Sequence, residues 1–181
     1  MASPDRGSTV ILPFRERLPR LDETVFVESS ARVIGDVDIG TDSSIWFGSV
    51  VRGDVHYIRI GARTNIQDLT VIHVNHGTCP AILEDEITVG HRAILHGCRV
   101  MSRSLIGMGA IILDEAEIGP EAVVAAGAVV SPGTRVPPRS LVRGVPAKVV
   151  RELTEEEIEQ IVDSAKRYVD LKNVYLGEAR S

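Results

Sequence analysis

An aliphatic residue returns at every sixth position through the second half of the chain. Most of these residues are followed, four positions later, by a small side chain. The aliphatic positions are Ile106, Ile112, Ile118, Val124, Val130, Val136 and Val142, and the small ones are Ala110, Ala116, Ala122, Ala128, Thr134 and Ser140. If roughly three residues in ten were aliphatic, seven matches in one register would arise by chance about 2 times in 10,000. A repeat of six residues therefore restricts the possible folds more than any other feature of the sequence.

The same period is present upstream, with two interruptions. Its members are Val27, Val33, Ile39, Ile45 and Val51, then, after a slip of three residues, Ile60, Ile66 and Ile72, and after a longer break Val89, Leu95 and Met101. Glycine often follows the aliphatic residue, as at Gly40, Gly107 and Gly119. We expect these glycines to relax the backbone limits at the bends between repeats.

A period of six predicts a mainly β fold built as a coil of short strands. Each hexad would form one strand and one corner, with its aliphatic residue pointing inward. Three hexads would close a triangular turn of about 18 residues, and stacked turns would bury one apolar column. The alternative is an antiparallel β-sandwich, which needs period-two alternation and hairpin turns such as Asn-Gly, and neither is clear here.

The repeat ends near Pro146, which cannot donate a hydrogen bond to a strand ladder. Thr154 and Glu157 then form the pattern of a helix capping box. Apolar residues follow at helical spacing, at Ile158, Ile161, Val162, Ala165 and Val169. The sequence therefore predicts an N-terminal segment (1–20), a β-helix (21–150) and a C-terminal helix and tail (151–181), with the helix running from 155 to near 175.

Composition excludes several classes of function. The net charge of −5 and an aromatic content of 4% argue against nucleic-acid binding. We expect no signal peptide and no membrane span, because no apolar run is long enough for either. Two cysteines, Cys79 and Cys98, indicate free or buried thiols rather than a disulfide framework, which fits a cytoplasmic protein.

The five histidines cluster unevenly along the chain. His91 and His96 are five residues apart, and His73 precedes His91 by 18 residues, the length of one turn. Residues one turn apart can lie close together on a β-helix. Three neutral imidazoles with one open position are typical of a catalytic zinc site. A histidine taken alone would more often be a surface residue.

Four segments resemble the γ-carbonic anhydrase family, and its bacterial short-loop branch most closely. They are Val51-Arg52-Gly53-Asp54, Asn65-Ile66-Gln67-Asp68, Val71-Ile72-His73, and Val89-Gly90-His91 with its continuation to His96-Gly97-Cys98. The resemblance covers residues 20 to 176. It implies a left-handed β-helix, a homotrimer, and one zinc ion at each subunit boundary that serves the hydration of carbon dioxide to bicarbonate.

The resemblance also assigns roles to individual residues. His73 and His96 would bind zinc from one subunit and His91 from its neighbour. Gln67 would contact the zinc-bound water, and Asn65 would line the same site. Three charged residues, Arg52, Asp54 and Asp68, would form ion pairs at the subunit boundary and shape the pocket, or would only hold the subunits together. Tyr168 is either a pocket residue or a helix-packing residue, and His56 and His76 are surface or outer groups.

One departure concerns the proton that must leave the site in each turnover. The best-studied active members carry a glutamate where this chain has Val55, and a long acidic loop between the first two zinc ligands. Here the intervening segment is short, with carboxylates only at Glu84, Asp85 and Glu86. His76 is a substitute candidate, since its unperturbed pKa is about 6.5. We therefore expect carbon dioxide hydration to be slow or silent.

Other functions fit the same scaffold. One is a hexapeptide acyltransferase or a zinc-dependent acyl-CoA thioesterase, and another is a non-catalytic metal-binding trimer. Iron or cobalt could occupy the same histidines. The sequence predicts neither the natural metal and substrate nor the path of residues 74 to 88.

Overall fold

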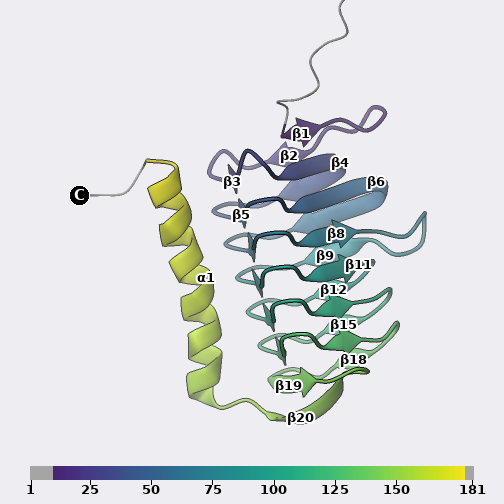
Figure 1. Ribbon diagram of the computed structural model, residues 1–181, viewed down its shortest axis with the longest axis vertical. Helices are drawn as coiled ribbons and strands as arrows, with labels where there is room; N and C mark the ends of the chain where they lie inside the picture. The colour runs from purple at the N-terminus through teal and green to yellow at the C-terminus, as the bar shows by residue number, and fades with distance from the viewer. Residues whose placement is uncertain (1–9, 178–181) are drawn as a thin grey trace, which may run out of the picture.

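Short parallel strands stack into a left-handed coil with three flat faces, beside one long helix (Figure 1). The computed structural model describes residues 10–177, so parts of the predicted N-terminal segment (1–9) and C-terminal tail (178–181) lie outside the described residues. The predicted hexapeptide β-helix is confirmed. The parallel ladder excludes the antiparallel sandwich.

Each face is a column of paired strands. Face 1 contains β1 (Ile11–Leu12), β8 (Val71–His73), β11 (Ile94–His96), β14 (Ile111–Ile112) and β17 (Val129–Val130). Face 2 contains β2 (Arg20–Leu21), β9 (Ala81–Leu83), β12 (Arg99–Val100), β15 (Glu117–Ile118) and β18 (Arg135–Val136). Two long strands, β4 (Arg32–Ile39) and β6 (Val50–Ile60), bend around the corner and serve both of these faces.

Face 3 carries the helix. Its strands are β3 (Phe26–Val27), β5 (Ser44–Ile45), β7 (Asn65–Ile66), β10 (Thr88–Val89), β13 (Leu105–Ile106), β16 (Val123–Val124), β19 (Ser140–Arg143) and β20 (Lys148–Glu152). The last pair, β19 and β20, is antiparallel and closes the end of the coil.

The inward column of aliphatic side chains forms the core. Ile106, Ile112 and Ile118 are fully buried, as the period of six predicts. The prediction was wrong at Met101, because the neighbouring Val100 takes the inward position, pairing with Leu83 and Ile118 on either side. This turn of the coil is one residue shorter than the repeat.

The two interruptions of the repeat are local insertions into the coil. Between the pairs Gly35–Gly53 and Val37–Ile58, β6 contains three more residues than β4, which accounts for the slip of three. The longer break is a turn over 74–80 between faces 1 and 2. It lengthens its turn of the coil, so that Thr88 pairs with Asn65, 23 residues earlier.

The glycines that follow the aliphatic residues serve close packing rather than unusual backbone angles. Gly107 does not have a positive φ, so the expectation that it relaxes a bend was wrong. A Cβ at Gly107 would lie 2.4 Å from the backbone nitrogen of Ala126 on the next turn. Any side chain here would push two turns of the coil apart.

The Gly107→Ala variant is expected to be destabilised by about 1–3 kcal/mol, the usual cost of overpacking a close-packed interior. Urea unfolding at fixed protein concentration measures this. Gly133→Asn is the control, because Gly133 has a φ of +66° with open space around its Cβ position, and asparagine tolerates that backbone. Equal stability of the two variants would contradict the packing role.

The C-terminal helix, α1 (Glu155–Tyr175), begins at the predicted capping box. The Thr154 hydroxyl oxygen accepts a hydrogen bond from the Glu157 backbone N–H, and the Glu157 carboxylate accepts one from the Thr154 backbone N–H. Ile158 and Ile161 pack with Leu153 against the outside of face 3. The helix runs back along the coil, so that its C-terminal half lies beside the early turns (Figure 1). Within residues 10–177, no helix is long and apolar enough to cross a membrane.

One buried lysine of α1 contacts an aspartate of the coil. The Lys172 side chain is 1% exposed, and its Nζ lies 3.0 Å from Asp42 Oδ1. Nζ also donates to Asn173 Oδ1 at 2.6 Å.

Cys79 and Cys98 are buried free thiols, and burial together with the charge of Asp114 raises the pKa of Cys98 to about 12.

Candidate metal centre

His73 and His96 lie side by side on neighbouring strands, at the corner between faces 1 and 2. They are in register between β8 and β11, and His73 Nδ1 lies 3.2 Å from His96 Nε2. We refer to them as the paired histidines. His91 follows His73 by 18 residues, but the inserted turn over 74–80 shifts the register by five residues, so that His96 rather than His91 pairs with His73.

A carboxylate holds the other ring nitrogen of each paired histidine. Asp54 Oδ1 lies 3.0 Å from His73 Nε2, and Asp114 Oδ1 lies 2.5 Å from His96 Nδ1. An ionised carboxylate only accepts hydrogen bonds, so both of these nitrogens carry hydrogen. In neutral rings, the remaining nitrogens then have only lone pairs. Two lone pairs therefore face each other across 3.2 Å, an arrangement that a cation between them would stabilise.

Asp54 is held in its ionised form by its neighbours. Burial pushes the pKa of Asp54 upward, but hydrogen bonds from His73 and Arg52 and the positive charge of Arg52 outweigh it and leave the pKa lowered. Arg52 donates to Asp54 Oδ2 while His73 occupies Oδ1. Arg52 and Asp54 thus form an ion pair within one chain, at the base of the paired histidines.

The third predicted ligand, His91, lies at the other end of face 1, at its corner with face 3. Its Nδ1 is 2.6 Å from Asp68 Oδ2, and Asp68 Oδ1 also accepts from the Phe47 backbone N–H at 3.2 Å. Because the Asp68 carboxylate can only accept, Nδ1 carries the hydrogen, and in a neutral ring the lone pair lies on His91 Nε2. The His91 side chain is 37% exposed, so this nitrogen is accessible from outside the chain. We call His91, Asp68 and Gln67 the His91 corner.

Gln67 is the outer end of a buried chain of polar side chains. Gln67 Nε2 donates to Asn65 Oδ1 at 3.1 Å, and Asn65 Nδ2 donates to Thr88 Oγ1 at 3.0 Å. Thr88 then donates to Ser164 Oγ on α1 at 3.4 Å. Gln67 is fixed through its amide nitrogen, and no described residue donates to its oxygen. That oxygen is therefore left to accept a hydrogen bond from a ligand.

Tyr168 of α1 lies near the same corner. Its ring packs edge-on against Trp46, with the centroids 5.5 Å apart. Burial, and then the negative charge of Asp68, raise the pKa of Tyr168. Its hydroxyl is therefore a proton donor at neutral pH, while its ring anchors the helix.

Within one chain, the two groups do not meet. His91 lies in the turn that precedes β11, at one end of face 1, whereas His96 is the last residue of β11, at the other end. Accordingly, no three histidine, cysteine, aspartate or glutamate side chains in the described part of the chain lie together as a metal site. The paired histidines and the His91 corner thus lie at opposite edges of face 1.

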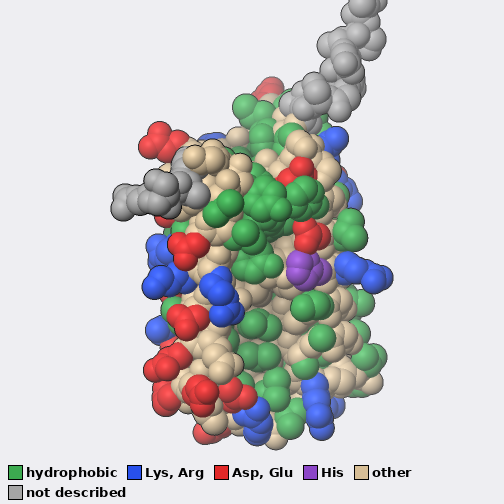
Figure 2. All heavy atoms as spheres, turned by 60° about the vertical axis from the view of Figure 1, so that its left-hand side comes forward, with side chains coloured by type: hydrophobic (Ala, Val, Ile, Leu, Met, Phe, Trp, Pro, Cys, Tyr) green, Lys and Arg blue, Asp and Glu red, His purple; other side chains and the backbone are tan. Residues whose placement is uncertain are grey.

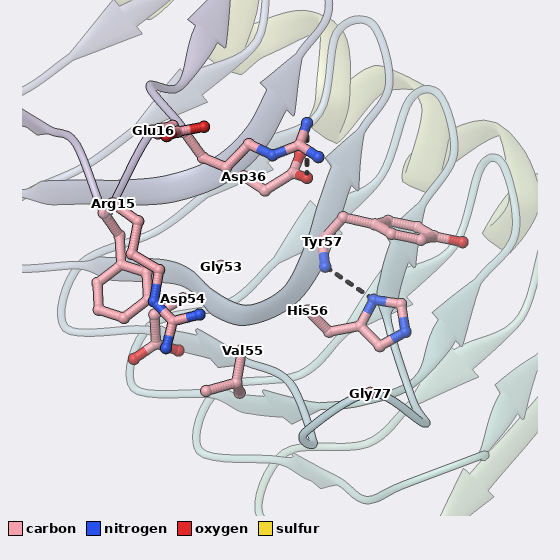
Figure 3. A pocket seen from close by; sticks show the side chains of 11 residues that line it. Arg15, Glu16, Asp36, Gly53, Asp54, Val55, His56, Tyr57 and Gly77 are labelled. Carbon is pink, nitrogen blue, oxygen red and sulfur yellow. Dashed lines mark hydrogen bonds and ion pairs between the residues drawn. The ribbon is translucent and has the colours of Figure 1, made fainter.

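A cavity of about 500 Å³ opens beside Asp54 (Figure 3). The turn at Phe14–Arg17 borders one side, and the inserted residues Val55, His56 and Tyr57 of β6 border the other. Val55 thus lines a cavity that also reaches Asp54, the hydrogen-bond partner of His73. His56 lines the cavity with its Nδ1 accepting from the Tyr57 backbone N–H at 2.9 Å, whereas His76 is exposed on the 74–80 turn.

Sequence reasoning missed Asp114, Thr88 and Ser164. A signal for Asp114 was present, because it follows His96 by 18 residues, one regular turn of the coil. Ser164 had no comparable signal, since its contact with Thr88 depends on how α1 lies against face 3.

Several known proteins with similar sequences carry carbonic anhydrase names. The mitochondrial gamma carbonic anhydrase 2 of Arabidopsis thaliana is 46% identical over 90% of this chain, which spans 60% of that relative's length. The carbonic anhydrase of Geobacillus kaustophilus is 45% identical, with 92% of this chain and 91% of the relative covered. Protein YrdA of Escherichia coli is 40% identical over 94% of this chain and 96% of its own length.

Solved structures show the same fold. A Bacillus cereus protein described as an acetyltransferase has a TM-score of 0.89 at 45% identity, over 91% of this chain and 95% of its own. A hexapeptide transferase family protein of Anaplasma phagocytophilum has a TM-score of 0.88 at 40% identity, over 92% and 98%. None of the protein-family models compared with the sequence matches it. On its similarity to a gamma carbonic anhydrase and to carbonic anhydrases that it matches over nearly their whole length, the chain belongs to the γ-carbonic anhydrase family.

Proposed function

We propose that this chain forms a homotrimer that binds one zinc ion between each pair of neighbouring subunits. His73 and His96 of one subunit and His91 of the next would hold it. The observation that carries the proposal is the pair of facing lone pairs on His73 Nδ1 and His96 Nε2. Two nitrogens bound at about 2.0–2.1 Å to a tetrahedral zinc lie about 3.3 Å apart. Their separation of 3.2 Å fits that distance without rearrangement.

The surface of face 1 supports the sharing of the site between subunits. Its outward side chains include Val71 and Ile94, which are 38% and 41% exposed, and Leu69 and Met108 at its edge are 60% and 61% exposed. Figure 2 shows a patch of hydrophobic side chains with a histidine and an acidic side chain just below it. A closed threefold ring would bury such a face and would set the His91 corner of one subunit against the paired histidines of another.

The reaction that this site supports best is the reversible hydration of carbon dioxide to bicarbonate. When bound, zinc supplies a water with a pKa of about 7 as the nucleophile. Gln67 would orient that water through its free oxygen, because Asn65 already holds its amide nitrogen. Asp54, Asp68 and Asp114 would keep the three imidazoles in the tautomers that leave their lone pairs available.

Proton release is the step that this chain supports least. Val55 lines the cavity beside Asp54, at the position where the family resemblance predicts a glutamate. We therefore expect hydration to be limited by proton transfer and to be accelerated by added buffer bases such as imidazole. A cytoplasmic location remains the prediction from the sequence.

Metal content and stopped-flow carbon dioxide hydration of the purified protein test the proposal. We expect about one zinc per subunit and a rate above that of the His73→Ala variant. Protein without bound metal would contradict the site, while bound zinc with no rate above His73→Ala would contradict the reaction alone. Reconstitution with Fe²⁺ or Co²⁺ identifies the metal that supports the highest rate.

A further inference from the structure

Asp114 is the one carboxylate of the centre that lies inside neither of the sequence motifs around it. It lies two residues after the end of β14, one turn of the coil beyond His96. Its Oδ1 lies 2.5 Å from His96 Nδ1, and its Oδ2 accepts from Asn75 Nδ2 at 3.2 Å. Both oxygens are thus engaged, one by a paired histidine and one by the 74–80 turn.

We propose that Asp114 is a positioning residue for the metal centre, an inference that rests on the proposed function. It keeps the hydrogen of His96 on Nδ1 and directs the lone pair of Nε2 toward His73. With Asp114 ionised, only this tautomer makes the hydrogen bond, because a carboxylate has no hydrogen to donate. Without it, the His96 ring would be free to adopt the other tautomer, which places a hydrogen where the metal must bind.

The surroundings of Asp114 show that this carboxylate is itself held in place. Asn75 donates to Asp114 while its own Oδ1 accepts from the His76 backbone N–H at 2.8 Å. Asn75 also pairs with Cys79 across the inserted turn. The inserted turn, which breaks the repeat, therefore holds the Asp114 oxygen that His96 does not contact.

Metal affinity separates a positioning role from a structural one. Loss of an outer partner of a ligating histidine typically weakens metal binding or activity by about 10–100-fold. We expect Asp114→Asn to weaken zinc binding by about that factor in competition with a chromophoric chelator. The amide has the same shape but both donates and accepts, so it no longer selects one tautomer. Glu117→Gln is the matched control, because Glu117 lies on the next strand and faces Arg135 rather than a histidine.

Ring-nitrogen NMR of the metal-free protein provides a second readout that does not depend on zinc. We expect His96 in the wild type to carry its hydrogen on Nδ1, and Asp114→Asn to populate both tautomers at unchanged melting temperature. Wild-type affinity together with an unchanged tautomer in Asp114→Asn would overturn the inference while leaving the proposed function standing. Wild-type protein that binds no zinc would overturn the proposed function, and the positioning role with it.

Discussion

Replacing His91 by alanine is expected to remove zinc from every site and to abolish carbon dioxide hydration, while the fold remains intact. His91 would be one of three ligands. Its removal should therefore weaken zinc binding by more than the roughly 10–100-fold caused by removing an outer partner of a ligating histidine. The side chain is 37% exposed at a corner, and Asp68 keeps its hydrogen bond from the Phe47 backbone. Surface changes of this kind usually alter stability by less than about 0.5 kcal/mol. Metal analysis and urea unfolding of the same preparation measure both effects.

His76→Ala is the control for this experiment. His76 is exposed on the 74–80 turn and only its backbone bonds to Asn75. Its removal should leave metal content unchanged and should slow hydration only if the imidazole carries protons. Full metal occupancy in His91→Ala would show that the paired histidines suffice and would contradict a three-histidine centre.

Removing the charge of Asp42 is expected to cost about 3 kcal/mol of stability. Breaking a buried ion pair on one side typically costs about 3–5 kcal/mol, because the remaining charge stays buried without compensation. Lys172 is 1% exposed, whereas Asp42 is 34% exposed and Asn173 still accepts from Lys172, so the lower end of that range applies. Asparagine also suits the positive φ of residue 42. Urea unfolding of Asp42→Asn at fixed protein concentration gives the value.

Lys172→Met tests whether the unpaired charge causes the loss. This change removes the ammonium but keeps most of the side-chain volume, and it leaves Asp42 at the surface. We expect it to be much less destabilising than Asp42→Asn, and the double variant to resemble Lys172→Met alone. If Lys172→Met lost more stability than Asp42→Asn, the attraction between Lys172 and Asp42 would itself stabilise the packing of α1, and the cost would not come from an unpaired buried charge.

The regular part of the fold could be predicted because each hexad repeats one local rule. Ile106, Ile112 and Ile118 are inward wherever six residues make one strand and one corner. The rule fails where residues are inserted, and the sequence does not reveal which neighbours an insertion brings into register. His73 therefore lies beside His96 rather than His91. The glycine positions were recognisable, but their role was not, since it depends on how closely adjacent turns approach.

The metal-centre residues were named from family resemblance, and their chemistry within the chain became clear only from geometry. Spacing places His91 and His96 within one repeat of the coil, but the carboxylate behind each ring depends on contacts between turns. Asp114 had the 18-residue signal, whereas the link from Gln67 through Asn65 to the helix depends on tertiary packing. The assignment of these residues to one zinc centre stays a prediction.

Mixed trimers test the sharing of the centre most directly. Neither His91→Ala nor His73→Ala should bind zinc alone. When the two are unfolded together in equal amounts and refolded, each mixed ring should contain one boundary with all three histidines. Random assembly then restores about one quarter of the wild-type zinc content and a corresponding share of activity. Recovery of that fraction is the result we predict, and mixed trimers that bind no zinc would contradict a centre shared between subunits.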